Sequence, residues 1–260
     1  MDTEQLVAEI EKLFATWRPA QPVPGVAAPV QPSVAAVTAP AIVYPPLSVI
    51  DTNRNVTKIA APLKSAGAVT VLRYISAINP AGEKTVKDAE ARAIAAAGLR
   101  LGLVCEGWGD FAHGGISAGA GERDGEFCRD YLPKLGAPVS AIVVYAVDTD
   151  ATAGEIAKLV IPYFRAVNAA VGGKHRIGVY GSGAVCEAVM DAGLAVLSMT
   201  ACSLGWSGTR AYLAANKQGL RQHLPGTNPM LAPLHLDYDP NDVRAGVTDI
   251  GDYVPFAAAA

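Results

Sequence analysis

The stretch Ala141–Asp150, AIVVYAVDTD, decides the fold class. It runs through seven apolar or aromatic residues without a charge and then ends in two carboxylates, Asp148 and Asp150. A continuous apolar run of this length is typical of a strand that helices cover on both faces, as in a parallel α/β sheet. Because ligands in such folds bind at the C-terminal ends of the strands, the two acids lie where a site would form.

The same pattern repeats along the chain from Ser48 onward. Strands are predicted at 49–51, 69–75, 101–105, 142–147, 177–180, 195–201, 220–223 and 234–236. Helices are predicted at 56–66, 86–97, 122–135, 153–171, 183–192 and 209–216, and Pro162 should kink or divide the fourth of these. Eight strands that alternate with helices predict an α/β fold, a (β/α)8 TIM-type barrel over residues 48–256, better than an open sheet. The last two repeats lack clear helices, so closure of the barrel is the least secure part.

Two segments precede the predicted barrel. Residues 4–17 have helical spacing of apolar side chains, which predicts an amphipathic helix within residues 1–18. Residues 19–47 form a Pro/Ala/Val-rich linker arm that favours extended polyproline II structure. The helix cannot bury its apolar face alone. We expect it to dock on the barrel, on another copy or on a partner, which leaves open a homo-oligomer or larger assembly through residues 1–46.

Composition excludes several classes of function. The 260 residues are 51% hydrophobic and 17% charged, with a net charge of −3 and no basic run, so nucleic acid is not an expected partner. No apolar segment is long enough for a membrane span. The four cysteines form no CxxC pair and are expected to be buried free thiols, with neither a zinc site nor a disulfide framework. No cofactor is expected. The first residues, MDTEQLVAEIEKLF, lack signal-peptide features, so we expect a cytoplasmic, virion-associated or otherwise exported protein.

Carboxylates recur at the predicted C-terminal ends of the strands. They are Asp51, Glu106, Asp148, Asp150 and Asp237. Closure of the barrel would bring these ends together at one mouth, and like charges held close together raise one another's pKa. That is the arrangement which an acid/base pair needs for glycoside hydrolysis. A single acid at such a position could equally be a helix cap or a solvated loop group, but the set as a whole favours a site.

Aromatic and polar side chains accompany these acids and are candidates for substrate binding. Sugars present apolar C–H faces that stack on aromatic rings, whereas amide and guanidinium groups can orient hydroxyls. The substrate-binding candidates are Tyr74, Arg73, Trp108, Tyr180, Trp206 and Gln222. Ordinary packing is an alternative for each aromatic residue.

Other motifs give weaker evidence for a function. The turn Gly181-Ser182-Gly183 lacks the third glycine of a dinucleotide fingerprint, and the chain contains no GxSxG elbow. The segment that starts at Asp237 has Asp242 where a calcium loop needs glycine, which excludes an EF-hand. The histidines have no metal-ligand spacing. No metal is predicted, although a divalent ion among the mouth acids stays a minor alternative.

Taken as an ordered set, several segments resemble a known family. They are Ile50–Thr52, Leu72–Ile75, Glu90–Gly98, Val144–Asp150, Ile177–Gly181, Arg221–Gln222 and Leu236–Asp237. They resemble the DUF1906 family of glycoside-hydrolase-like domains, which is related to the Rv2525c-type proteins of mycobacteria. The resemblance covers roughly Ser48 to Asp242. It implies a TIM barrel related to the lysozyme-like muramidases of glycoside hydrolase family 25.

The resemblance also implies roles for the acids. Those muramidases carry Asp-x-Glu at the end of strand four, with the Glu as the acid, and the corresponding residues here are Asp148-Thr149-Asp150. The second acid is one methylene shorter. Asp148 is therefore the expected nucleophile or stabilising carboxylate, and Glu106 or Asp150 the expected proton donor. Asp51 and Asp237 would complete the polar floor of the site.

Two functions of different classes follow from these observations. The first is a glycoside hydrolase-like protein that acts on cell-wall peptidoglycan by carboxylate acid/base chemistry. The second is a glycan-binding or structural module without catalysis, built into a larger assembly such as a phage virion tail or a cell-envelope complex. The shortened acid at position 150 keeps the second hypothesis open.

Overall fold

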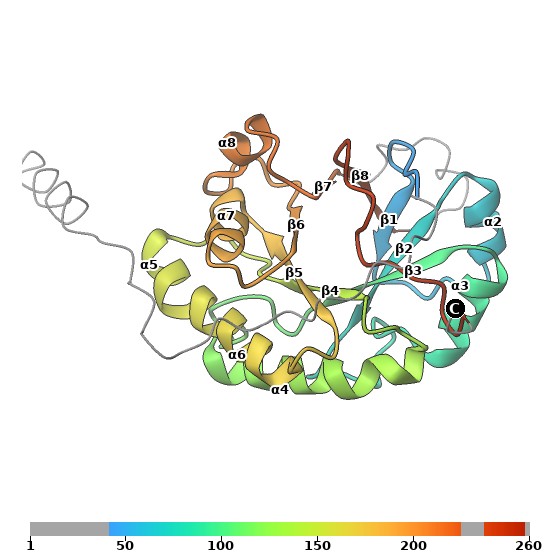
Figure 1. The fold of residues 1–260 in the computed structure, drawn as a ribbon, viewed down its shortest axis with the longest axis horizontal. Coiled ribbons are helices and arrows are strands. Elements are labelled where there is room, and N and C mark those ends of the chain that lie inside the picture. The colour runs from blue at the N-terminus through green and yellow to red at the C-terminus, as the bar shows by residue number, and fades with distance from the viewer. Residues whose placement is uncertain (1–41, 225–236, 258–260) are drawn as a thin grey trace, which may run out of the picture. The chain divides into compact units, whose positions relative to one another are not determined.

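A closed barrel of eight strands forms the body of the protein. The computed structural model describes residues 42–224 and 237–257, and the strands follow one another around the barrel in chain order (Figure 1). The strands are β1 (Val49–Thr52), β2 (Thr70–Ile75), β3 (Arg100–Cys105), β4 (Ile142–Ala146), β5 (Arg176–Gly181), β6 (Leu197–Thr200), β7 (Leu220–Gln222) and β8 (Asp239–Val243). The predicted TIM-type barrel is confirmed. The predicted N-terminal helix and most of the arm lie outside the described residues.

The last strand differs from the expectation. Neighbouring strands from β1 to β7 pair in parallel, but β8 pairs antiparallel with both β7 and β1. The predicted strand at 234–236 lies outside the described residues, and the strand that closes the barrel is Asp239–Val243. Because β8 runs in the opposite direction, its first residue, Asp239, and not its last, reaches the same end of the barrel as Asp51.

Helices connect the strands and cover the outside of the barrel. They are α2 (Ala60–Ser65), α3 (Asp88–Ala96), α4 (Ala118–Tyr131), α5 (Ala153–Glu155), α6 (Ile161–Val171), α7 (Gly183–Asp191) and α8 (Thr209–Ala214). A 3-10 turn, η1 (Leu132–Leu135), extends α4. A π-helical turn, η2 (Ile156–Val160), joins α5 to α6 directly before Pro162. Proline lacks an N–H, and its ring displaces the preceding turn, which accounts for the interruption that the sequence predicted.

The helix α4 begins earlier than predicted. Ser117 caps it by accepting a hydrogen bond from the N–H of Ala120, so that Gly119 and Gly121 belong to the helix and not to the preceding loop. Of these glycines, Gly121 allows α4 to pack closely against α6. A methyl group on Gly121 would meet the carbonyl oxygen of Tyr163 at 2.3 Å, which shows how closely α4 lies against α6.

Alternation along the strands divides the core into two layers. In β4, Ile142, Val144 and Ala146 belong to an apolar cluster inside the barrel, whereas Val143 and Tyr145 belong to the larger cluster between the barrel and its helices. Side chains two residues apart share a face of a strand. A polar residue at the next inward position therefore faces the interior at the end of the barrel. This rule places the site residues described below.

We call the C-terminal ends of β1–β7 the mouth of the barrel and the opposite end its floor. The C-terminal segment closes the floor: Ile250 joins the inner apolar cluster, and Asp252 accepts hydrogen bonds from the hydroxyls of Tyr44 and Thr70. Arg100, at the start of β3, forms an ion pair with Asp252. Tyr44, which lies before β1, is thus tied to a residue close to the end of the described chain.

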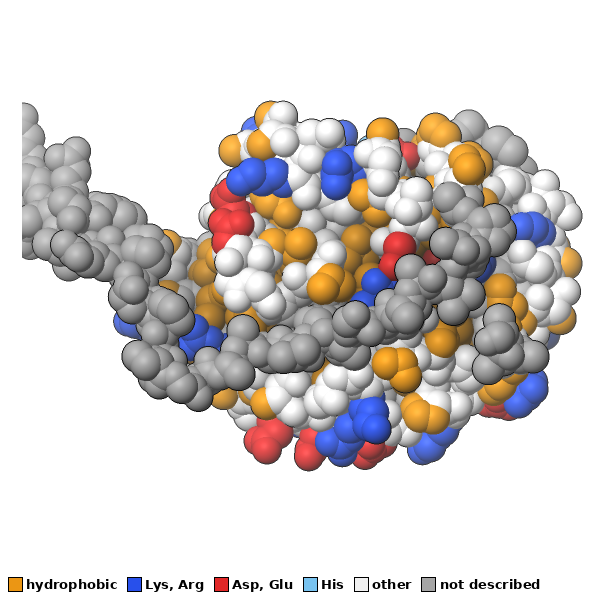
Figure 2. Space-filling view, in the orientation of Figure 1, with side chains coloured by type: hydrophobic (Ala, Val, Ile, Leu, Met, Phe, Trp, Pro, Cys, Tyr) orange, Lys and Arg blue, Asp and Glu red, His pale blue; other side chains and the backbone are white. Residues whose placement is uncertain are grey.

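The face shown in Figure 2 has no large patch of one charge, because acidic and basic side chains lie mostly at its edge. Apolar side chains gather around a central hollow on the same face. Within residues 42–224 and 237–257, none of the helices is both long and apolar enough to cross a bilayer. These residues include four free cysteines, of which Cys105, Cys128 and Cys186 are buried as expected, while Cys202 is partly exposed.

Candidate functional site

Two neighbouring cavities occupy the mouth of the barrel. The first has a volume of about 240 Å³, and the second, of about 160 Å³, shares Tyr74, Glu106, Asp148 and Asp239 with it. The remaining lining residues of the first are Val104, Ala146, Tyr180, Met199, Cys202, Ser203, Trp206 and Gln222. The remaining lining residues of the second are Asp51, Thr52, Asn53, Lys84, Asp237 and Tyr238. Five carboxylates and one lysine thus line the mouth.

Asp51 is buried at the base of this site. Its carboxylate accepts hydrogen bonds from the Tyr74 hydroxyl at 2.9 Å, from Asn241 Nδ2 at 2.8 Å and from Gln222 Nε2 at 3.2 Å. Burial raises the pKa of Asp51, and the three donors oppose that rise. With its oxygens already occupied, Asp51 is suited to holding its neighbours in place.

Glu106 extends from the end of β3 and pairs with a lysine from the loop that precedes α3. Lys84 Nζ lies 2.9 Å from Glu106 Oε2 and 4.3 Å from the centre of the Tyr74 ring. Burial raises the pKa of Glu106, the Lys84 ammonium group lowers it, and Asp148 and Asp51 raise it further. The pKa of Glu106 therefore lies above its ordinary value, and the Lys84 ammonium group limits the rise.

Asp148 follows Ala146 by two positions and faces the mouth next to Glu106. Its backbone N–H donates to the carbonyl oxygen of Gly109 at 2.8 Å. Gly109 has a φ of +70°, and a methyl group there would lie 3.2 Å from Asp148 Cβ and 3.5 Å from Glu106 Cγ. The loop after β3 therefore packs directly against both acids and fixes their relative position.

Asp239 is a site residue that the sequence did not indicate. It lies opposite Asp51 in the β1–β8 pairing and lines both cavities. Burial raises the pKa of Asp239 to about 7, and the charges of Asp51, Asp237 and Asp148 contribute to the rise. A carboxyl group with this pKa is protonated in roughly half of the molecules at pH 7, which suits a general acid. Asp239 stands in the sequence Asp-Pro-Asn-Asp, which is typical of a turn, so the pattern of apolar residues did not predict a strand there.

Tyr180 and Gln222 form a rigid polar wall. The Tyr180 hydroxyl donates to Gln222 Oε1 at 2.9 Å, and the N–H of Cys202 donates to the same oxygen at 3.4 Å. Because both donors fix the carbonyl side of the amide, its Nε2 must face the carboxylates of Asp51 and Asp239. The tyrosine hydroxyl thus sets the orientation of a donor between two acids.

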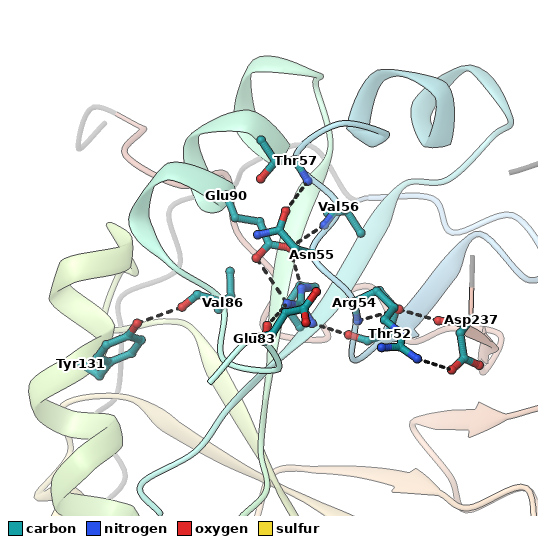
Figure 3. Close-up of polar contacts among 11 residues, drawn as sticks. Thr52, Arg54, Asn55, Val56, Thr57, Glu83, Val86, Glu90, Tyr131 and Asp237 are labelled. Carbon is teal, nitrogen blue, oxygen red and sulfur yellow. Dashed lines mark hydrogen bonds and ion pairs between the residues drawn. The ribbon is translucent and has the colours of Figure 1, made fainter. Parts of the chain in front are cut away.

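Three predicted site residues do not line either cavity: Arg73, Trp108 and Asp150. The Arg73 guanidinium is buried and pairs with Glu90 at 2.7 Å. Arg73 also donates to the carbonyl oxygens of Thr52 and Glu83, while Glu90 accepts from the N–H of Val56 (Figure 3). This pair therefore joins the loop after β1 to the loop that carries Lys84, and its donors are already occupied within the protein.

Asp150 lies away from the acids because β4 ends at Ala146 and the alternation does not continue. Its carboxylate accepts from the N–H of Ser207 at 2.8 Å, from the Ser207 hydroxyl at 3.1 Å and from the N–H of Ala151 at 3.0 Å. These bonds tie the end of β4 to the loop that carries Trp206. Asp237 does line the second cavity, where it lies 3.8 Å from Arg54 near the surface (Figure 3).

The mouth therefore combines carboxyl groups in different environments. The pKa values of Asp239 and Glu106 are raised, the Asp51 carboxylate accepts three side-chain hydrogen bonds, and Asp148 lines both cavities with Glu106 and Asp239. Such differences between neighbouring carboxyls are what general acid/base chemistry requires. Among residues 42–224 and 237–257, no group of three or more His, Cys, Asp or Glu side chains has an arrangement that would hold a metal ion.

Comparison with known proteins gives consistent matches. The model of the family described as "Rv2525c-like, glycoside hydrolase-like domain" matches residues 61–230. "Uncharacterized protein YbfG" of Bacillus subtilis is 33% identical over 116 residues, which are 41% of this chain and 16% of that protein. The "Putative peptidoglycan hydrolase Rv2525c" of Mycobacterium tuberculosis is 27% identical over 143 residues, which are 52% of this chain and 58% of that protein. The matched regions thus span less than two thirds of the length of these relatives.

A solved structure supports the fold. The crystal structure of the Mycobacterium tuberculosis Tat-secreted protein Rv2525c in complex with HEPES has a TM-score of 0.63 and 19% sequence identity to this chain. The alignment covers 78% of this chain and 97% of that one. At this identity the likeness concerns the fold of the barrel.

Proposed function

The chain belongs to the Rv2525c-like, glycoside hydrolase-like domain family, and from this membership we propose that it binds cell-wall glycan at the mouth of the barrel and hydrolyses peptidoglycan by carboxylate acid/base chemistry. The name of the mycobacterial relative supports peptidoglycan as the substrate. The observation that carries the proposal is the cavity in which Asp148 adjoins two carboxyl groups of raised pKa, Glu106 and Asp239.

Each acid receives a role from its surroundings. Asp148 is the nucleophile or the carboxylate that stabilises the positive charge of the transition state. Asp239 or Glu106 donates the proton to the departing sugar oxygen, because both hold a proton more readily than an ordinary carboxyl group. Asp51 orients Tyr74, Gln222 and Asn241. Asp150 receives no catalytic role here, because Ser207 and Ala151 occupy its oxygens.

Sugar release from peptidoglycan tests this proposal. The purified protein should release reducing ends, and Asp148→Asn should lower the rate by at least about 1,000-fold, in line with the loss of a principal catalytic group. Asp130→Asn is the matched control, because Asp130 is an exposed carboxylate on α4 that pairs with Arg129. No release by the wild type, or equal release by Asp148→Asn, would contradict hydrolysis.

A second candidate function is glycan binding without cleavage. The observation that favours it is the position of Asp150, because related muramidases carry the acid there and this chain uses the residue to hold Ser207. The Lys84 ammonium group also favours the ionised form of Glu106. In this case the barrel would serve as a binding module of a larger assembly, joined to it through residues 1–46.

Two measurements separate the candidates. A binding module retains peptidoglycan in a sedimentation assay without releasing sugar, and Asp148→Asn changes neither result. The assembly role is tested by removing residues 1–46 and measuring the oligomeric mass by light scattering. An unchanged mass would argue against assembly through this segment.

A further inference from the structure

The loop after β3 carries an aromatic surface just outside the cavities. Trp108 is the one aromatic residue among the exposed large hydrophobic side chains of the described residues, with 54% of its surface accessible. Its ring stacks on His113, with the ring centres 4.9 Å apart and the planes at 26°. One face of the indole is thus covered from within the loop, while more than half of the side-chain surface stays accessible.

The loop holds this pair in a fixed place. The carboxylate of Asp110 accepts from the N–H of His113 at 2.9 Å, and its other oxygen lies 2.9 Å from His113 Nδ1. Gly115 lets the loop fold back against Trp108, because a methyl group at Gly115 would meet Trp108 Cβ at 2.8 Å. An exposed tryptophan that is held before any ligand arrives loses little side-chain freedom on binding.

The same loop is joined to the acids. Gly109, the residue after Trp108, packs against Asp148 Cβ and Glu106 Cγ, and its carbonyl oxygen accepts from the N–H of Asp148. Trp108 is thus the chain neighbour of a residue that packs against both acids, although its own side chain lines neither cavity. The Trp108–His113 pair therefore belongs to the loop that packs against both acids.

The cavities are small compared with a polymer. The larger cavity has a volume of about 240 Å³, below the roughly 300–1,000 Å³ typical of sites that enclose a drug-sized ligand. A glycan chain longer than the two neighbouring cavities can hold would continue onto the rim. The apolar C–H face of a pyranose ring matches an exposed indole, and the uncharged ring meets no repulsion from the acids inside.

We propose that the Trp108–His113 pair binds a second sugar residue of the same glycan chain, next to the one in the cavity, so that the protein selects a polymer over a free monosaccharide. This inference rests on the proposed glycan function of the mouth, and it names the length of chain that the site recognises. It holds whether the bound chain is cleaved or only retained.

Binding of N-acetylglucosamine oligomers from one to six residues, measured by calorimetry on the full chain, tests the inference. Asp148→Asn serves as the background, which prevents turnover during the titration. Affinity should rise about tenfold or more from the monomer to the longer oligomers. Adding Trp108→Ala should remove that gain and leave monosaccharide binding unchanged, whereas Trp108→Phe should keep most of the gain.

Two further variants sharpen the result. Asp110→Ala, which removes the acceptor for His113, should lower the affinity for oligomers but not for the monomer. Val139→Ala is the matched control, because Val139 is an exposed apolar residue that precedes β4 at the floor. Affinity that is independent of chain length, or an equal loss for monomer and oligomer in Trp108→Ala, would overturn the inference and leave glycan binding intact. No binding of any oligomer would overturn the proposed function together with it.

Discussion

Asp239 shows how its surroundings change the chemistry of a single carboxyl group. It faces Asp51 across the β1–β8 pairing and lies near two further acids, and burial together with these charges raises its pKa to about 7. An unfolded aspartate has a pKa near 3.9. Between about pH 4 and pH 7 the folded protein therefore holds a proton that the unfolded chain has released.

This difference predicts a loss of stability with rising pH. A folded state that binds more protons than the unfolded state becomes less stable as the pH rises through that window. Replacing Asp239 by Asn removes the titration. The free energy of unfolding of the wild type should fall by about 1–2 kcal/mol relative to Asp239→Asn between about pH 5 and pH 8. Urea denaturation at both pH values measures it, and parallel pH profiles for the two proteins would contradict it.

At the residue scale, the sequence predicted those site residues that obey alternation. Asp51, Glu106 and Asp148 lie at inward positions of β1, β3 and β4 or directly after them, so strand prediction alone places them at the mouth. Asp150 breaks the rule because the strand has ended. Lys84 comes from a loop that has no periodic pattern, and only the packing held by Arg73 and Glu90 brings it to Glu106.

The packing of α4 against α6 shows what pattern analysis misses at the scale of elements. The glycines between Gly109 and Gly121 look like a loop, and the helix was predicted to start at Glu122. In the structure Gly121 and Gly125 face α6 so closely that no side chain fits between the helices. Helix propensity penalises these glycines, but tertiary packing requires them.

A pair of glycine substitutions on α4 should therefore have opposite effects. A methyl group on Gly125 would meet Ala170 Cβ at 2.8 Å and the carbonyl oxygen of Val167 at 3.0 Å. Gly125→Ala should lower the free energy of unfolding by about 1–2 kcal/mol, because overpacking exceeds the gain in helix propensity. Gly119→Ala, where nothing lies within 4 Å, should raise it by about 0.5–1 kcal/mol. Thermal unfolding of both variants measures these changes, and equal shifts would exclude helix packing as the cause.

Closure of the barrel depends on contacts across the whole molecule, and it is the feature of the fold that the sequence predicted least well. Repeated strand–helix units predicted β1 to β7, since each unit carries its own local pattern. The eighth strand, Asp-Pro-Asn-Asp-Val, has neither apolar alternation nor β propensity, and only its pairing with β1 and β7 makes it a strand. Contacts between residues about 190 positions apart cannot be inferred from local patterns.

The floor of the barrel provides a test at this scale. Asp252 accepts from Tyr44 and Thr70 and forms an ion pair with Arg100, so it links the beginning and the end of the described chain. Asp252→Ala should lower the free energy of unfolding by about 2–4 kcal/mol, because it removes the carboxylate that pairs with Arg100 and leaves two hydroxyls without their acceptor. Asp130→Ala, on the exposed face of α4, should change it by less than about 0.5 kcal/mol. Similar values for the two variants in urea denaturation would contradict this role for Asp252.

The tie between Tyr44 and Asp252 also places the point at which the described chain enters the barrel. Tyr44 joins the barrel at the floor, whereas the cavities open at the mouth, at the opposite ends of the same strands. The described chain therefore enters the barrel at the end away from the acids.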